Sequence, residues 1–303
     1  MKKIIKKILT ITLTLVLVFN CFNLINPVVK AANTSKKVTS YYMQLSKREK
    51  SCYKILHKQI KKHPTKNSFN LSLKVKKTYK NYKKLKTTGN KFSKNNITAL
   101  VALTFDHPEY FWLRNYSVGW KAYGTKKYFV VAVKVKFISP TVHNKKRVKK
   151  FNNKLNSVVK KLKSKTYGKT KASKAATINE WIVKNVNYKL GTQKDLYNAY
   201  GALVNKKATC DGISSLYKIL CNKLGIRCMK IAGYASFNGQ GGPHAWNYIK
   251  IGKKWYAVDS TWNIGSKNIK EWFMKGSGFT KSHKFISDYM FSMNVKKFKI
   301  PKL

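Results

Sequence analysis

Hydrophobic and polar residues follow different periods along this 303-residue chain, and each change of period predicts an element. Apolar residues three and four apart are typical of a helix with one buried face, and strict alternation is typical of a half-buried strand. Helical spacing recurs in three segments before residue 165: residues 47–62, 94–105 and 141–163. Alternation recurs in three others: residues 69–75, 110–120 and 127–138. This part of the chain is therefore expected to be a mixed α/β unit.

The clearest helical pattern follows residue 209. Small and apolar residues recur there at helical spacing, with polar residues between them: Ser214, Leu216, Tyr217, Ile219, Leu220 and Leu224. Gly225 ends the pattern, as glycine commonly does just past a helix. Thr209 suits the N-cap position, and Asp211 suits the first turn, where a negative charge complements the helix dipole. Cys210 is therefore expected at the N-terminus of this helix.

The chain after this helix has the pattern of paired strands. A strand over residues 229–237 is followed by a glycine-rich stretch, residues 237–243, that predicts a flexible loop. Alternation resumes over residues 244–251 and again over 255–261. The Gly252-Lys253 pair between them predicts a two-residue hairpin turn.

A two-residue turn determines which residues face each other across this hairpin. Ile251 then lies opposite Lys254, and Trp246 lies opposite Asp259. His244 is two residues before Trp246 on the same face of the sheet, so it becomes a diagonal neighbour of Asp259. A three-residue loop with a bulge would reverse this parity.

Cys210, His244 and Asp259 are the residue types, in chain order, of a nucleophile, a general base and an acid that orients the base. Free N–H groups at a helix N-terminus favour a thiolate and can stabilise an oxyanion, and a carboxylate holds an imidazole in place. Gly212 is expected to leave room for a substrate backbone. Each residue alone has a structural alternative: a small core residue for Cys210, a half-buried histidine for His244 and a strand-end cap for Asp259. The combination of all three points to catalysis.

Several segments, in order, resemble the transglutaminase-like superfamily, which shares a papain-like core with cysteine proteases. They are INEWIVKNVNYKL, KKATCDGISSLYKILCNKLGI, GIRCMKIAGYA and HAWNYIKIGKKWYAVDSTWN. The resemblance implies an α+β fold, with the nucleophile at the N-terminus of a helix packed on an antiparallel sheet. It also implies that Cys210 is the nucleophile, His244 the general base and Asp259 its orienting acid. Animal cross-linking transglutaminases have glutamine where this chain has Thr209, so the chain resembles a secreted bacterial branch more closely.

The resemblance also suggests how the chain is divided. Residues 1–31 have the basic start, apolar run and small-residue cleavage site of a signal peptide. The alternative is an uncleaved anchor, but the apolar run is short for a membrane span. Residues 32–165 are expected to form an N-terminal α/β extension, and residues 166–303 a transglutaminase-like catalytic domain with a C-terminal tail. We therefore expect a secreted protein, extracellular or associated with the cell wall, with no stable transmembrane span after signal removal.

The charge of the chain is strongly positive, at a formal +55, and comes almost wholly from lysine. Such a charge favours polyanions, and for an exported bacterial protein these include teichoic acid and other anionic wall polymers. The alternative is a compositional bias towards lysine. No arginine-rich or aromatic recognition motif is visible, so specific binding of nucleic acid is not expected.

The remaining chemistry-bearing residues receive structural interpretations. Cys221 and Cys228 lie in or near apolar runs, and the three cysteines of this region lack the spacing of a zinc site, so no metal, cofactor or obligatory disulfide, including one to Cys52, is expected. The segment DHPEYFW, residues 106–112, predicts a helix end and a turn because of its proline. His283 has no evident partner and is expected to be structural.

These features predict a cysteine-dependent acyl transferase or hydrolase that acts on amide bonds of proteins or cell-wall peptides. An amine acceptor would give a cross-link, whereas water would give deamidation or cleavage, and the sequence leaves this choice open. One alternative is a non-catalytic wall-binding module on the same fold. Another is a nucleic-acid-binding protein driven by charge alone.

Overall fold

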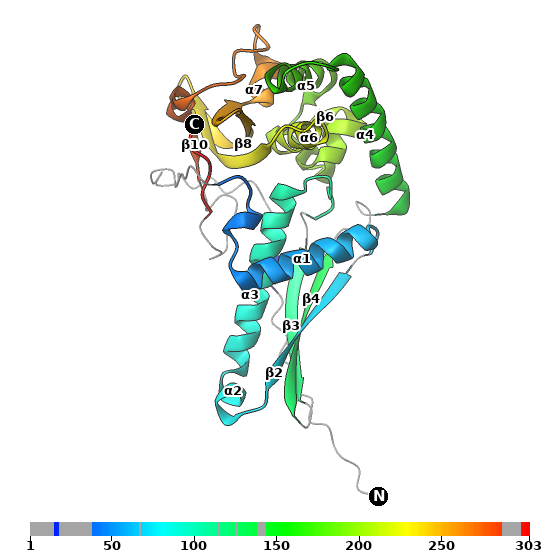
Figure 1. Ribbon diagram of the computed structural model, residues 1–303, viewed down its shortest axis with the longest axis vertical. Helices are drawn as coiled ribbons and strands as arrows, with labels where there is room; N and C mark the ends of the chain where they lie inside the picture. Colours follow the sequence, from blue (N-terminus) through cyan, green and yellow to red (C-terminus); the bar gives the residue numbers. More distant parts are fainter. Residues whose placement is uncertain are drawn as a thin grey trace, which may run out of the picture.

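Two lobes, each with an antiparallel sheet and helices, make up the structure, which is a computed structural model (Figure 1). It describes residues 38–66, 68–113, 116–124, 127–137, 144–286 and 298–303, together with the backbone of residues 15–17. The signal peptide expected over residues 1–31 lies outside the described residues apart from those three. Within the described part, no helix is both long enough and apolar enough to cross a membrane.

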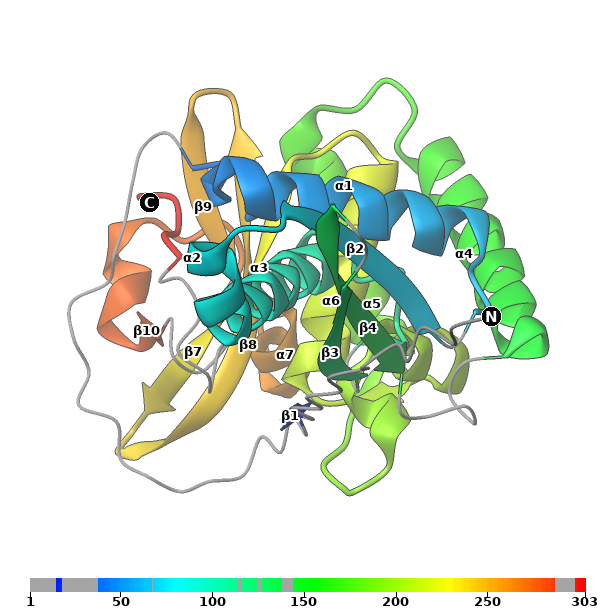
Figure 2. The same ribbon diagram turned by 90° about the horizontal axis from the view of Figure 1, so that it is seen from below.

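The lower lobe in Figure 1 contains a four-stranded sheet in the order β1-β3-β4-β2. Its antiparallel strands are β1 (Leu15–Leu17), β2 (Ser68–Lys76), β3 (Tyr116–Gly124) and β4 (Tyr128–Phe137). Its helices are η1 (Tyr42–Gln44), α1 (Lys47–Lys62), α2 (Tyr79–Lys83) and α3 (Leu85–Asp106). Seen from below, α1 crosses β2 and α3 runs beside β3 and β4 (Figure 2).

The upper lobe contains a second antiparallel sheet in the order β10-β7-β8-β9. Its strands are β7 (Cys228–Phe237), β8 (Gln240–Ile251), β9 (Lys254–Val258) and β10 (His283–Phe285). The longer helices are α4 (Lys145–Lys165), α5 (Lys171–Asn185), α6 (Cys210–Lys223) and α7 (Ser260–Gly265). Short elements complete the lobe: the parallel pair β5 (Asn187–Tyr188) and β6 (Lys207–Ala208), the 3-10 helices η2 (Lys194–Tyr197) and η4 (Ser277–Lys281), and the π-helical turn η3 (Gly201–Asn205).

Local sequence accounts for several helix ends. Ser46 and Glu49 form a reciprocal capping box at the start of α1, which begins and ends where the hydrophobic pattern predicts. Helix α3 begins nine residues before the predicted one, at Leu85 instead of residue 94. Its extra turns include Gly89, where a Cβ would lie only 2.5 Å from the Trp120 ring. Close packing of the helix on the sheet thus explains a glycine that weakens the helical pattern.

Two tight hairpins connect the strands of the upper sheet. The predicted turn at Gly252 and Lys253 is confirmed, because Ile251 pairs with Lys254. The flexible loop predicted over residues 237–243 is wrong: β7 and β8 continue to a two-residue turn at Asn238 and Gly239. Both turn residues have positive φ, 50° and 78°, which suits the twist of a hairpin. Two of the glycines that suggested a loop, Gly241 and Gly242, lie in the paired strand β8 instead.

The N-terminal segment and the C-terminal tail join the two lobes. Tyr41 is buried, and its hydroxyl donates to the Lys230 carbonyl of β7 at 2.7 Å. The backbone amides of Tyr41 and Tyr42 donate to the carboxylate of Asp106 at the end of α3, at 3.0 and 2.8 Å. Phe298 of the tail packs edge-on against the Tyr41 ring. The mixed α+β architecture predicted from the sequence is therefore present, with the Cys210 helix packed on an antiparallel sheet.

Candidate active site

Cys210 is the first residue of α6, as the pattern predicts, and it is partly exposed. The helix buries one side against β7 and β8, and its leucines and Tyr217 belong to the core. Thr209 occupies the N-cap position, but its hydroxyl donates to the Leu196 carbonyl at 3.1 Å and does not cap the helix. The first N–H groups of α6 therefore have no side-chain cap, which leaves helix-terminal donors near the thiol.

Gly212 has a different role from the one the sequence suggested. A Cβ at this position would lie 2.7 Å from the Asn198 carbonyl and 2.9 Å from that of Leu196. Gly212 is buried, so it makes room for the chain's own backbone and not for a substrate. Close packing of α6 on η2 holds the N-terminus of the helix, and with it Cys210, in place.

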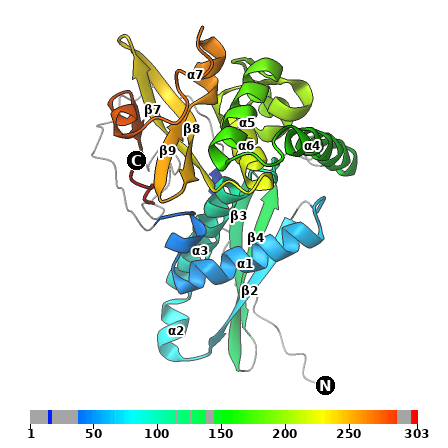
Figure 3. The same ribbon diagram turned by 45° about the horizontal axis from the view of Figure 1, so that its top comes forward.

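His244 reaches the site from β8, which lies beside α6 (Figure 3). The β8–β9 register pairs Asn247 with Val258, so Asp259 follows the last paired residue of β9. His244 Nε2 lies 2.7 Å from Asp259 Oδ2, which is the diagonal contact expected from the two-residue turn. The imidazole also interacts with the side chain of Cys210, which helps to raise its pKa. Since Nε2 faces the aspartate, Nδ1 is the ring atom left for the thiol.

The carboxylate of Asp259 binds both the start of α7 and the ring of His244 on β8. Its Oδ1 accepts hydrogen bonds from the backbone N–H groups of Thr261 and Trp262, at 2.9 and 3.1 Å, and so caps α7. Its Oδ2 faces His244, and the side chain is wholly buried. The strand-end cap and the partner of histidine, which were alternatives in the sequence, are thus two functions of one carboxylate.

Burial and charge act in opposite directions on this pair. Burial by itself would lower the pKa of His244, but the Asp259 carboxylate and then Cys210 outweigh it and raise that pKa to about 10. Burial would raise the pKa of Asp259, but His244 and then His283 hold it well below its usual range. The geometry therefore favours a charged pair at neutral pH, with an imidazolium beside the Cys210 sulfur.

His283 is the member of this cluster that sequence reasoning missed. Its Nε2 lies 3.1 Å from Asp259 Oδ2, and Ser282 Oγ lies 2.8 Å from its Nδ1. The ring is fully enclosed and stacks on Phe279 at 3.7 Å between centroids. Burial lowers the pKa of His283, so it stays neutral and donates its Nε2–H to the aspartate. Only the pairing of β10 with β7 brings this tail residue to the site, and a single sequence gives no sign of that pairing.

Tyr188 also lies within the electrostatic reach of the site. Burial raises its pKa to about 12, with further contributions from Cys210 and Asp259. It belongs to β5, whose parallel pairing with β6 places it next to the residues that lead into Cys210. The side chain is still 44% exposed, so it stands where a substrate could contact it.

One set of potential metal ligands occurs among the described residues, and it is the same cluster. Nitrogen and oxygen atoms of His244, Asp259 and His283 lie within 4.8 Å of one another. The Nε2 atoms of His244 and His283 both lie at hydrogen-bonding distance from the same oxygen, Asp259 Oδ2. The arrangement is therefore that of a hydrogen-bonded relay.

The other predicted candidates lie elsewhere. The segment DHPEYFW contains the end of α3 and a turn, as expected. His107 Nδ1 pairs with Glu109 Oε1 at 2.8 Å in the lower lobe, where the described cysteine, Cys52, is buried. Cys52, Cys221 and Cys228 are buried, unpaired thiols. Burial raises the pKa of Cys52 to about 11, so it is a poor nucleophile at neutral pH.

Known proteins are similar to the part of the chain that contains this site. Residues 157–260 match the profile of the transglutaminase-like superfamily. Kyphoscoliosis peptidase of Homo sapiens is 32% identical over 98 residues, which cover 28% of this chain and 15% of the human protein. The mouse protein is 31% identical over the same span, so the chain matches only a small part of these relatives.

Solved structures match this chain only weakly. The protein in the structure titled "Crystal structure of a TGase" is 12% identical in sequence to this chain, with a TM-score of 0.35. The match covers 63% of this chain and 50% of the other chain. The periplasmic domain of TgpA from Pseudomonas aeruginosa is 12% identical in sequence to this chain, with a TM-score of 0.29. That match covers 49% of this chain and 72% of the TgpA domain. The profile match includes α5 to β9 and the residues Cys210, His244 and Asp259. Residues 157–260 of this chain are thus similar to the transglutaminase-like superfamily.

Proposed function

We propose that this protein is a cysteine-dependent acyl transferase or hydrolase that acts on amide bonds of proteins or cell-wall peptides. Cys210 is the nucleophile, His244 the proton carrier and Asp259 its orienting acid. The observation that carries the proposal is the position of the His244 ring between Cys210 and the buried Asp259 carboxylate. The similarity of residues 157–260 to the transglutaminase-like superfamily supports an enzyme, and no metal or cofactor is needed for this chemistry.

The proposed reaction has two halves. In the first, Cys210 Sγ attacks the carbonyl carbon of an amide, and the oxyanion that forms faces the N–H groups at the start of α6. His244 gives its proton to the departing nitrogen, the C–N bond breaks, and a thioester remains on Cys210. In the second, an amine or water attacks the thioester, His244 takes its proton, and the thiolate leaves. An amine gives a new amide, and water gives a carboxylic acid.

The protein is further proposed to work outside the cell, at the cell wall. The positive charge supports this location because wall polymers are anionic. The second candidate function is a wall-binding module without turnover, and the same charge favours it. A site that joins a partly exposed thiol to an enclosed charged pair favours the enzyme, since binding alone requires none of these contacts.

The test is one set of assays on the purified protein and on Cys210→Ala. Each is incubated with glutamine peptides plus a labelled amine, and separately with peptidoglycan stem peptides. We expect amine incorporation or fragment release from the wild type, and a loss of about 10⁴-fold or more in the variant. If both proteins were equally inert while both bound cell walls, the binding module would be the better account.

A further inference from the structure

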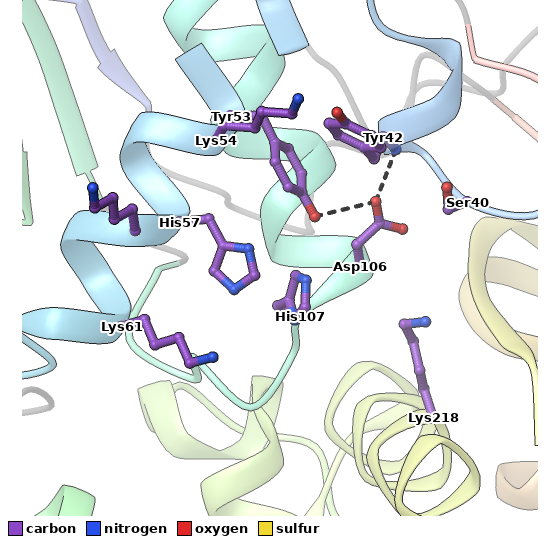
Figure 4. Close-up of a pocket in the computed structure, with 10 residues that line it drawn as sticks. Ser40, Tyr42, Tyr53, Lys54, His57, Lys61, Asp106, His107 and Lys218 are labelled. Atoms are coloured by element: carbon purple, nitrogen blue, oxygen red, sulfur yellow. Dashed lines mark hydrogen bonds between the residues drawn. The ribbon is translucent and has the colours of Figure 1, made fainter. Parts of the chain in front are cut away.

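A hollow lies at the junction of the two lobes, against the C-terminal half of α6, whereas Cys210 is at the N-terminus of that helix. It is a shallow hollow, largely open to solvent, with a volume of about 640 Å³, which is within the range of small-ligand sites. Three elements meet there: α1 on one side, the end of α3 at the floor, and the C-terminal half of α6 on the other side (Figure 4). Nothing in the proposed acyl-transfer chemistry uses this hollow, so its lining requires a separate explanation.

The lining of the hollow is cationic. Lys54, Lys58 and Lys61 of α1, here called the lysine row, recur at spacings of four and three residues and so share one helix face. All three are exposed, and none forms an ion pair with a carboxylate of the described residues. Their charges therefore face the hollow and solvent without compensation.

Lys218 supplies a fourth positive charge from α6. It is only 5% exposed, and its ammonium donates to the Cys228 carbonyl at 2.6 Å, which fixes its position. In Figure 4 the side chain rises from α6 towards Asp106 and His107. An ammonium has three donors, so two remain for a ligand.

The lining contains one carboxylate, that of Asp106, and its oxygens are already in use. They accept from the backbone amides of Tyr41 and Tyr42, and the Tyr53 hydroxyl lies 3.5 Å away (Figure 4). Burial also disfavours the negative charge of Asp106 by raising its pKa, although the positive charge of Lys218 opposes this effect. The balance of charge in the hollow therefore favours an anion.

The shape of the donors indicates which anion. Lysine ammoniums are compact point charges that suit oxygens directed in several directions, as in a phosphate, whereas planar carboxylates are matched by arginine forks. No arginine lines the hollow. We propose that this hollow is a phosphate-binding site, for free phosphate or a phosphate ester, between the lysine row and Lys218. The site lies between α1 and α6, so a bound ligand would contact both the lower lobe and the upper lobe.

The test is a titration of the full chain at constant ionic strength with inorganic phosphate, glycerol 3-phosphate and a glycerophosphodiester. Acetate at equal charge is the control anion. Isothermal titration calorimetry measures the affinity. The proton NMR signals of His57 report binding at this site, because the His57 ring lines the hollow, with its centroid 4.2 Å from that of His107. We expect saturable 1:1 binding of at least one of the three phosphate compounds, with a shift of the His57 signal. The compound that binds most tightly indicates whether the natural ligand is free phosphate, a monoester or a diester.

A matched pair of variants separates a built site from diffuse charge. The first replaces Lys54, Lys58 and Lys61 with glutamine. The second replaces Lys146, Lys150 and Lys154, three exposed lysines on one face of α4. The first should weaken phosphate binding about tenfold or more, and the second less than about twofold. Equal losses in both variants, equal binding of acetate, or binding that leaves the His57 signal unmoved would overturn the proposal.

Discussion

The His244–Asp259 pair of the upper lobe and the His107–Glu109 pair of the lower lobe have nearly the same contact distance, 2.7 and 2.8 Å. Their surroundings differ. The first pair is 9% and 0% exposed, whereas the second is 29% and 32% exposed. The first joins residues of different elements, and the second spans two positions of one turn. A histidine–carboxylate contact alone is therefore a weak sign of catalysis.

What distinguishes the upper pair is support from three directions. Helix α6 delivers a thiol to one side of His244, α7 donates two N–H groups to Asp259, and β10 adds His283. Each contact constrains the next, which is how an active site holds its geometry. The lower pair belongs to the turn that follows α3, and Cys52, the described cysteine of its lobe, is buried.

The largest expected difference between the two pairs concerns their carboxylates. Asp259→Asn should lower the turnover of the proposed reaction by about 10³- to 10⁴-fold, because an amide cannot stabilise the imidazolium of His244. Glu109→Gln should change turnover by less than about twofold. Steady-state rates of both variants in the assay that detects wild-type activity measure this contrast. Similar losses in the two variants would mean that the upper pair has no special role.

A smaller effect is expected from His283, which we assign as a positioning residue for Asp259. His283→Phe keeps an aromatic ring on Phe279 but removes the donor to Oδ2, and should lower kcat about tenfold with little change in KM. His283→Gln can still donate a hydrogen bond and should recover most of the loss. A purely structural role would lower the thermal stability of both variants without this difference in kcat.

The smallest effect concerns stability against pH. The pKa of His244 is about 10 in the folded protein and about 6.5 in an unfolded chain, so folding retains a proton between these values. Its contribution to the free energy of unfolding is complete below about pH 6.5 and is lost as pH rises towards 10. Urea unfolding at pH 7 and pH 10 should show this loss in the wild type and in Glu109→Gln. A His244→Gln variant that lost as much stability over the same range would contradict the assignment.

Sequence alone predicted the parts of the site that depend on local pattern. Cys210 at a helix start follows from apolar spacing, and the contact between His244 and Asp259 follows from strand parity and a two-residue turn. The boundaries of α1 follow from its hydrophobic pattern. These features need only neighbours along the chain or across one hairpin.

The features that the sequence could not supply depend on distant contacts. His283 reaches Asp259 only because β10 pairs with β7. Gly212 was expected to face a substrate, but the backbone of η2 occupies that space. The glycines after Phe237 suggested a loop, yet their strand is paired along its length. In each case tertiary packing decides between conformations that the local sequence permits.

The central claim, that Cys210 is a nucleophile activated by His244, is tested most directly by alkylation with iodoacetamide at neutral pH. Mass spectrometry follows each cysteine, so no substrate needs to be known. Cys210 should react at least about tenfold faster than Cys52, Cys221 and Cys228, and His244→Ala should slow it by about tenfold while leaving its exposure unchanged. Labelling of Cys210 no faster than the buried cysteines, or equally fast in His244→Ala, would contradict the account.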